Sequence, residues 1–189
     1  GGVQVAAFTA TADEETRSEI ISKLFAGKPR QFLRGFDRPN LFLAFEPKNT
    51  PKRQITEFVA ARAEQSGIIY CSSRRKTEDL AEHLRGKGVN ALAYHAGMDA
   101  AQRHINQARF SQEDAVVMAA TIAFGMGVDK PDVRFVVHAD LPKTMESYYQ
   151  EIGRAGRDGL PADTLCLYGV EDIKLRRRQI DEGEAPEMR

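Results

Sequence analysis

Short apolar runs alternate with amphipathic segments along this chain, and no other feature of the sequence restricts the fold so strongly. Runs such as G-I-I-Y-C (67–71) and R-F-V-V-H-A (134–139) have the length and the β-branched content of buried strands. The segments between such runs carry apolar residues at helical spacing. This alternation is typical of β-α-β units, in which parallel strands form one sheet and helices cover its faces. The sequence therefore predicts an α/β fold of three layers, with a central, mainly parallel sheet flanked by helices.

Turn and cap residues set the bounds of the expected elements. We expect strands at 3–8, 41–45, 67–71, 90–95, 115–120, 134–139 and 164–168. We expect helices from Thr11 to Leu24, from Lys52 to Gln65, from Ser73 to Gly86, from Asp99 to Phe110, from Thr144 to Gly153 and from Asp172 to Asp181.

The strands and helices from Leu41 onward are enough for one complete domain. The first 30 residues supply one strand and one helix, which is too little to fold alone. We therefore predict that residues 1–30 are the end of a preceding domain and that residues 31–40 are a connector. Residues 41–170 form the main domain, and residues 171–189 begin a following helical region or a tail.

Polar and small residues recur in the loops that follow the expected strands. Since the carboxyl ends of parallel strands meet at one edge of a sheet, we expect these loops to form a single extended surface. Hydroxyl groups and helix N-terminal amides donate hydrogen bonds to phosphate oxygens, so this surface suits a phosphate backbone. Ser73, Thr11 and Thr144 also fit helix caps, a role compatible with phosphate binding. The loops hold Thr9 and Thr11, Ser72 to Arg74, His95 to Gly97, Thr121 to Asp129, and His138 to Asp140.

The segment Q-E-I-G-R-A-G-R-D-G (150–159) sets two arginines three residues apart among three glycines. The glycines predict that the helix from Thr144 ends near Gly153, so that Arg154 and Arg157 project from a turn. Arginine donates to phosphate oxygens, and an arginine beside a transferred γ-phosphoryl group stabilises the transition state. A surface salt bridge would use the same residues for a much smaller effect.

The nucleotide site that such arginines would serve is missing from the sequence. There is no G-x-x-x-x-G-K-[ST] phosphate loop, and the acidic pair Asp13-Glu14 falls in the first turn of an expected helix, where acidic residues are common. G-M-G-V-D (125–129) allows a close backbone approach to a ligand, and Asp129 could accept hydrogen bonds from ribose hydroxyls. The arginines therefore indicate a nucleotide held outside this chain.

Composition restricts the partners and the compartment. The formal net charge is +0, so the whole chain gives no argument for a polyanionic partner, and the basic clusters at 28–62 and 174–178 fit either a solvated face or a nucleic-acid contact. Cys71 and Cys166 lie in apolar runs, which favours buried thiols over a disulfide or a zinc site. No apolar run approaches the roughly 20 residues of a membrane span, and no signal-peptide pattern is present. We expect a cytosolic protein without a membrane partner.

Six segments carry a family resemblance: F-T-A-T-A (8–12), F-D-R-P-N (36–40), G-I-I-Y-C-S-S-R (67–74), Y-H-A-G (94–97), A-T-I-A-F-G-M-G-V-D-K-P-D-V-R-F-V-V-H (120–138) and S-Y-Y-Q-E-I-G-R-A-G-R-D-G (147–159). Together they resemble the RecQ family of superfamily 2 ATP-dependent DNA helicases. DEAD-box RNA helicases share the architecture but usually carry a histidine where this chain has Gln150. The resemblance implies that residues 1–30 end a first RecA-like domain and that residues 41–170 form the second.

The resemblance also implies roles for individual residues. Gln150, Arg154 and Arg157 match a motif that faces the ATP triphosphate, with Arg157 as the arginine finger. Gly127 and Asp129 match positions on the nucleotide side. Thr9 and Thr11 match a motif that couples nucleotide state to DNA binding. The positions along single-stranded DNA are Ser72, Ser73, Arg74, His95, Gly97 and Thr121.

A member of this family would be a 3′-to-5′ DNA helicase of repair and recombination, cytoplasmic and associated with the nucleoid. ATP and Mg²⁺ would be held mainly by a first motor domain before residue 1, and single-stranded or partly duplex DNA would be the other partner. Zinc would belong to a region that follows residue 189 and that would start with the helix near Asp172, so residues 171–189 would be the start of this helical and zinc-binding region or a tail. We expect no metal site within this chain. We expect this chain alone not to hydrolyse ATP. The alternatives are a non-catalytic nucleic-acid-binding module and a DEAD-box-like RNA helicase domain.

Overall fold

The computed structural model describes residues 4–9, 14–25, 27–33, 37–125 and 128–183. The chain divides into two units, Gly1–Arg38 and Pro39–Arg189.

In the first unit, α1 (Glu14–Leu24) confirms the expected helix, and none of the residues of this helix is buried. The strand expected at 3–8 is wrong for residues 4–8. A strand needs a neighbouring strand to complete its backbone hydrogen bonds, and among the described residues no strand pairs with this segment. Its apolar side chains are exposed as a result, with Phe8 at 95%.

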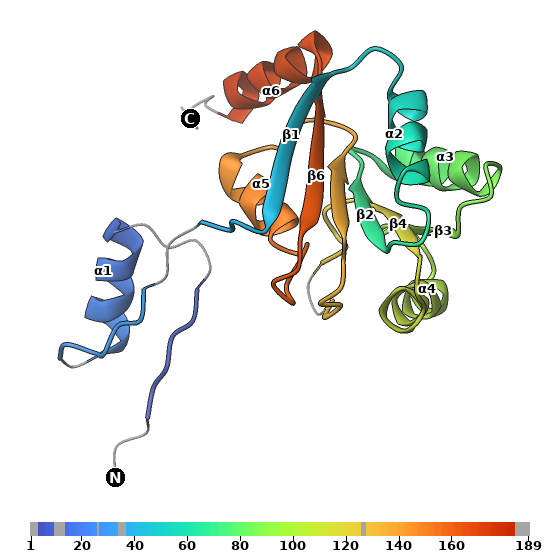
Figure 1. Ribbon diagram of the computed structural model, residues 1–189. Helices are drawn as coiled ribbons and strands as arrows, with labels where there is room; N and C mark the ends of the chain where they lie inside the picture. The colour runs from blue at the N-terminus through green and yellow to red at the C-terminus, as the bar shows by residue number, and fades with distance from the viewer. Residues whose placement is uncertain (1–3, 10–13, 26, 34–36, 126–127, 184–189) are drawn as a thin grey trace. The chain divides into compact units, whose positions relative to one another are not determined.

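Six parallel strands form the sheet of the second unit (Figure 1). In the order in which they lie side by side, they are β1 (Leu41–Pro47), β6 (Ala162–Tyr168), β5 (Phe135–His138), β2 (Gly67–Tyr70), β4 (Val117–Ala120) and β3 (Ala91–Tyr94). The register pairs Tyr70 with Ala120 on one side and with His138 on the other, so three strands end level with one another. The prediction of a central, mainly parallel sheet is confirmed.

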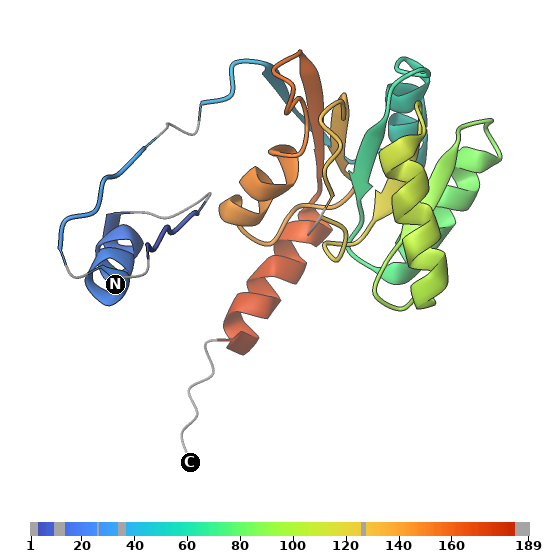
Figure 2. The same ribbon diagram turned by 90° about the horizontal axis from the view of Figure 1, so that it is seen from below.

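Helices lie on both sides of this sheet (Figure 2). They are α2 (Pro51–Ala60), α3 (Arg74–Arg85), α4 (Ala100–Gln112), α5 (Met145–Ile152) and α6 (Val170–Gly183). On one face, α2 and α3 enclose a buried cluster that includes Leu80 and Ile69. On the other face, α4 and α5 enclose a cluster that includes Phe110 and Ile68. Because neighbouring residues of β2 are buried on opposite faces, that strand is apolar throughout, and the three-layer prediction is confirmed.

The helix caps follow the sequence prediction. Ser73 Oγ accepts a hydrogen bond from Lys76 N at the start of α3, and Asp99 caps α4 with its carboxylate. Thr144 Oγ1 accepts from Ser147 N at 3.0 Å and begins α5. These polar side chains satisfy backbone amides that have no partner within the helix.

The end of α2 differs from the prediction, since this helix stops at Ala60 and not at Gln65. The residues that follow form turns, and Arg62 Nε donates to Asp163 Oδ2 of β6 at 2.8 Å. A contact with a residue so distant in sequence overrides the local helical pattern.

Candidate functional site

The carboxyl edge of the sheet gathers the loops after β2, β3 and β4 around an open hollow, which we call the carboxyl-edge hollow. The level ends of β2 and β4 produce this arrangement, because the loop at Ser72 and the loop at Thr121 leave the sheet side by side. Four of the residues expected to lie along DNA are among its lining. The lining comprises Ser72, Ser73, Arg74, Arg75, Ala96, Thr121, Ile122 and Ala123.

Arg74 lies against the backbone of Gly97 at the N-terminus of α3. A Cβ atom added to Gly97 would lie 2.8 Å from Arg74 Nη1 and 3.0 Å from its Cδ, so a larger residue would displace the arginine. Both residues are exposed. The guanidinium group and the positive end of α3 together suit a phosphate group.

His95 lies beneath this surface, and not on it. Its side chain is 4% exposed, and Nε2 lies 2.9 Å from Glu78 Oε1 of α3. Its carbonyl accepts from Met98 N at 3.1 Å and so turns the loop after β3. The ring supports the loop that carries Gly97, and its expected position along DNA stays a prediction.

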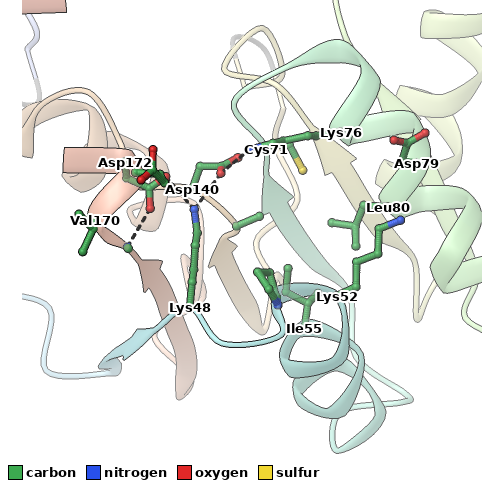
Figure 3. Close-up of a pocket in the computed structure, with 14 residues that line it drawn as sticks. Lys48, Lys52, Ile55, Cys71, Lys76, Asp79, Leu80, Asp140, Val170 and Asp172 are labelled. Atoms are coloured by element: carbon green, nitrogen blue, oxygen red, sulfur yellow. Dashed lines mark hydrogen bonds and ion pairs between the residues drawn. The ribbon is translucent and has the colours of Figure 1, made fainter. Parts of the chain in front are cut away.

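A buried carboxylate, that of Asp140, binds the loop at Ser72. Asp140 follows β5, is 8% exposed, and accepts a hydrogen bond on Oδ2 from Ser72 N at 2.9 Å. Its Oδ1 lies 2.7 Å from Lys76 Nζ and 2.9 Å from Lys48 Nζ. Figure 3 shows Lys48 also directed at Asp172 of α6, with Nζ 2.7 Å from Oδ1. This Asp140 network joins β1, β5, α3 and α6.

The network keeps its charges despite burial. Burial opposes the charge on Asp140, but hydrogen bonds from Lys48, Lys76 and Ser72 outweigh it and hold the pKa of this carboxyl far below its ordinary value. Burial also opposes the charge on Lys48, but its hydrogen bonds to Asp140 and Asp172 raise the pKa of this amine. Local sequence patterns place Asp140 in an edge loop but give no signal for its partners, which lie far away in the chain.

A cavity of about 470 Å³ lies beside this network, between α2, α3 and the start of α6 (Figure 3). Its lining includes Ile55, Leu80 and Cys71. Cys71 and Cys166 are both free and buried, which confirms the prediction for the two thiols. Burial raises the pKa of the Cys71 thiol to about 12 and that of the Cys166 thiol to about 11.

The segment 153–159, the arginine turn, follows α5 directly. Gly156 N donates to Val133 O at 2.9 Å, and Asn40 Nδ2 donates to the carbonyls of Gly156 and Leu160, each at 2.9 Å. Gly156 has a φ of +56°, and an added Cβ would lie 2.5 Å from Asn40 Nδ2, so the position requires glycine. Because Val133 precedes β5, the backbone of this turn lies at the amino end of that strand.

Both arginines reach from this turn to the loop after β4. Arg154 Nη1 donates to Gly125 O at 2.6 Å, and Arg157 Nη1 donates to Val128 O at 3.1 Å. Arg157 Nη1 also lies 3.7 Å from Asp129 Oδ1, and their side chains are 38% and 93% exposed. Arg154 Nε is buried and has no hydrogen-bond partner among the described residues.

Described residues of the loop after β4 therefore contribute to two surfaces. Thr121 to Ala123 line the carboxyl-edge hollow, whereas the carbonyls of Gly125 and Val128 bind the arginines. The sequence predicted correctly that the residues of both surfaces lie in loops, but it gave no indication of the contacts that the arginines make with the loop after β4.

The remaining expected site residues are Gln150, Thr9, Thr11 and Gly127. Gln150 is exposed on α5, and its Nε2 donates to Glu146 Oε1 at 3.3 Å. Thr9 is exposed in the first unit, whereas Thr11 and Gly127 lie outside the described residues. The roles of these positions stay predictions.

A buried histidine–glutamate pair also positions the arginine turn. His138 Nε2, at the end of β5, lies 2.6 Å from Glu151 Oε2 of α5, and the histidine is 1% exposed. The imidazole ring stacks on Tyr70 with ring centroids 5.5 Å apart. These contacts fix the last turn of α5, from which the arginines follow. The sequence predicted His138 at the carboxyl edge of the sheet, but its burial against α5 depends on the tertiary fold and was not predictable from the sequence.

In the ranges that the structure describes, no helix has the length and apolar content needed to cross a membrane. The histidine, cysteine and acidic side chains of those ranges form no group that could hold a metal ion.

Comparison with known proteins identifies the family. Residues 51–159 match the helicase conserved C-terminal domain family. The chain belongs to this family.

The RecQ resemblance of this helicase domain is confirmed by similarity over almost its whole length. It is 48% identical over 184 residues to the ATP-dependent DNA helicase RecQ of Haemophilus influenzae, covering 97% of this chain and 30% of that protein. It is 44% identical over 183 residues to the RecQ-like DNA helicase BLM of Xenopus laevis, covering 94% of this chain and 13% of that protein. The helicase domain thus spans less than a third of the length of these relatives.

Solved structures share the fold of this helicase domain. The TM-score is 0.66 with a DEAD box protein from Methanococcus jannaschii, at 24% identity, covering 93% of this chain and 48% of that chain. It is 0.71 with Saccharomyces cerevisiae Dbp5 bound to RNA and ADP BeF3, at 20% identity, covering 93% of this chain and 47% of that chain. The expected RecA-like fold is confirmed.

Proposed function

We propose that this chain contains the second motor domain of an ATP-dependent 3′-to-5′ DNA helicase that acts in DNA repair or recombination at the nucleoid. The loop 121–129 carries the proposal, because it borders the carboxyl-edge hollow and binds both arginines. This is the connection that a motor needs between a nucleotide and a DNA strand.

The arginines suit the phosphate groups of a nucleotide. Arg154 Nε is buried without a described partner, and Arg157 is 38% exposed with Nη1 bound to a carbonyl. ATP with Mg²⁺, which a preceding motor domain would mainly hold, would supply the phosphoryl bond that is cleaved. Arg157 stabilises the developing charge, an effect of about 10³ to 10⁵ in rate. Arg154 and Gln150 bind the triphosphate, and Asp129 binds the ribose together with Gly127.

The carboxyl-edge hollow suits single-stranded DNA. Ser72, Ser73 and Thr121 offer hydroxyl groups, and Arg74 offers a guanidinium group beside the small Gly97. Such donors bind the phosphate backbone and carry no sequence preference. Thr9 and Thr11 couple this binding to the nucleotide state, and His95 supports the loop from below.

Binding of a fluorescent single-stranded DNA oligonucleotide across a salt series tests this proposal. Arg74→Ala is expected to weaken binding about tenfold and to reduce the slope of log K against log salt by about 0.7, the share of one phosphate contact. Arg53→Ala is the matched control, because Arg53 is a 75% exposed arginine of α2. Equal losses in the two variants would contradict the proposal, and tighter binding of an RNA strand would favour the RNA helicase alternative.

A further inference from the structure

We propose that Asp140 is a positioning residue for DNA binding, which holds the loop at Ser72 so that its donors face the carboxyl-edge hollow. This inference rests on the proposed function of the hollow. Asp140 acts through the backbone amide of Ser72, and not by touching DNA.

The loop at Ser72 needs such support because its backbone amide no longer donates a hydrogen bond to the sheet. Directly after β2, the amide of Cys71 still binds the sheet, because it donates to Ala120 O at 2.8 Å. The next amide is that of Ser72, and it donates to Asp140 Oδ2 at 2.9 Å. Ser73 then caps α3. Asp140 therefore bridges the short stretch between a strand and a helix, on which the expected DNA contacts lie.

Asp140 is itself fixed from several sides. Ala139 N donates to Tyr70 O at 2.9 Å, which ties the segment before Asp140 to the end of β2. Lys48 and Lys76 approach the second carboxylate oxygen at 2.9 and 2.7 Å. A carboxylate accepts several charge-assisted hydrogen bonds at once, so this residue holds one amide and two ammonium groups in a defined geometry.

The charge of Asp140 has the wrong sign for a direct DNA contact. Both of its oxygens are occupied, it is 8% exposed, and its negative charge repels phosphate. Electrostatics alone therefore predicts that its removal strengthens DNA binding. A positioning role predicts the opposite result.

The experiment compares Asp140→Ala with Asp163→Ala in the whole chain. Asp163 lies 2.7 Å from Arg62 near the amino end of β6, at the opposite edge of the sheet, and its removal changes the net charge equally. We expect Asp140→Ala to bind the single-stranded oligonucleotide about tenfold more weakly, and Asp163→Ala to bind it unchanged. Amide hydrogen exchange at Ser72, measured without DNA, is expected to accelerate about tenfold in Asp140→Ala alone. Asp140→Asn keeps an acceptor for Ser72 and is expected to bind within about threefold of the unsubstituted chain.

Binding by Asp140→Ala at or above the unsubstituted affinity, with unchanged exchange at Ser72, would overturn the inference. If the unsubstituted chain binds no DNA, the proposed function of the hollow fails, whereas exchange at Ser72 still reports whether Asp140 holds the loop. If Asp140→Ala does not fold, Ser72→Pro is compared with Ser72→Ala, since only proline lacks the N–H group. We expect the proline variant to bind about tenfold more weakly than the alanine variant, and equal affinities would contradict the inference.

Discussion

Arg154 and Arg157 take their positions mainly from backbone carbonyls, and this matters for what they bind. The carbonyls of Gly125 and Val128 orient the guanidinium groups without neutralising them, and the nearest carboxylate, Asp129, lies 3.7 Å from Arg157. Gly125 is required for this packing, because an added Cβ would overlap Arg154 Nη2 and the residue has a φ of +153°. These carbonyl contacts leave the charge of both guanidinium groups in place, and the exposed Asp129 carboxylate offsets that of Arg157 in part.

The two cysteines are expected to be unreactive in the folded chain. Cys71 and Cys166 are 4% and 0% exposed, and burial raises both thiol pKa values well above neutrality. The thiolate is the reactive form, so Ellman's reagent at pH 8 is expected to find no reactive thiol in the folded chain and both thiols after unfolding in guanidinium. Rapid labelling of either cysteine in the folded chain would contradict the burial.

Single-residue roles were predictable where a local pattern determines them. Ser73 and Thr144 were recognisable as caps because a cap needs only the next few residues. The burial of His95 and the partners of Asp140 were not recognisable, because they depend on Glu78, Lys48 and other residues brought together by the fold.

Among the elements, the ends of β1 and β5 and the start of α6 depend on one lysine. Lys48 lies between Asp140 and Asp172, and its side chain is 16% exposed. Removing one partner of a buried ion pair leaves a buried charge without compensation. Through its two ion pairs, Lys48 therefore holds the start of α6 beside the ends of β1 and β5.

Lys48→Met is expected to lower the free energy of unfolding by about 3 kcal/mol at pH 7, measured by urea denaturation. Lys52→Met, on the exposed surface of α2, is the control and is expected to change it by less than about 0.5 kcal/mol. The deficit depends on pH because Lys48 helps to hold the pKa of Asp140 below its ordinary value. That contribution is fully present above the unfolded-state pKa of about 4 and declines below it, and it is lost only as the pH falls through the much lower folded-state pKa of Asp140. The deficit should therefore be smaller at pH 3 than at pH 7. A deficit that stays constant down to pH 3 would show that charge is not its cause.

The types of the elements were predictable from the pattern of apolar residues, and most bounds of the helices followed from their cap residues. The apolar runs at 67–71 and 134–139 form central strands because both of their faces are buried. The run at 3–8 has a similar pattern but no strand beside it among the described residues. The pattern of apolar residues shows that a segment tends to form a strand, but the strand forms only where a neighbouring strand can pair with it.

For the whole molecule, the parallel sheet explains why distant segments form one surface and why the arginine turn is separate from it. The turn lies at the amino end of β5, whereas the loops at Ser72 and Thr121 leave the carboxyl edge. Described residues of the loop after β4 belong to both regions, since Thr121 to Ala123 line the carboxyl-edge hollow and the carbonyls of Gly125 and Val128 accept from the arginines.

We propose that Arg157 serves a nucleotide held by another domain of a helicase. The direct test is a chimera in which this chain replaces the matching segment of the Haemophilus influenzae RecQ helicase, to which it is 48% identical. The measurement is kcat for DNA-dependent ATP hydrolysis in the chimera with and without Arg157→Ala, with Arg53→Ala as the control. We predict that Arg157→Ala lowers kcat by about 10³ or more while DNA affinity stays within about twofold. An active chimera that keeps more than roughly a tenth of its kcat after Arg157→Ala would contradict the account.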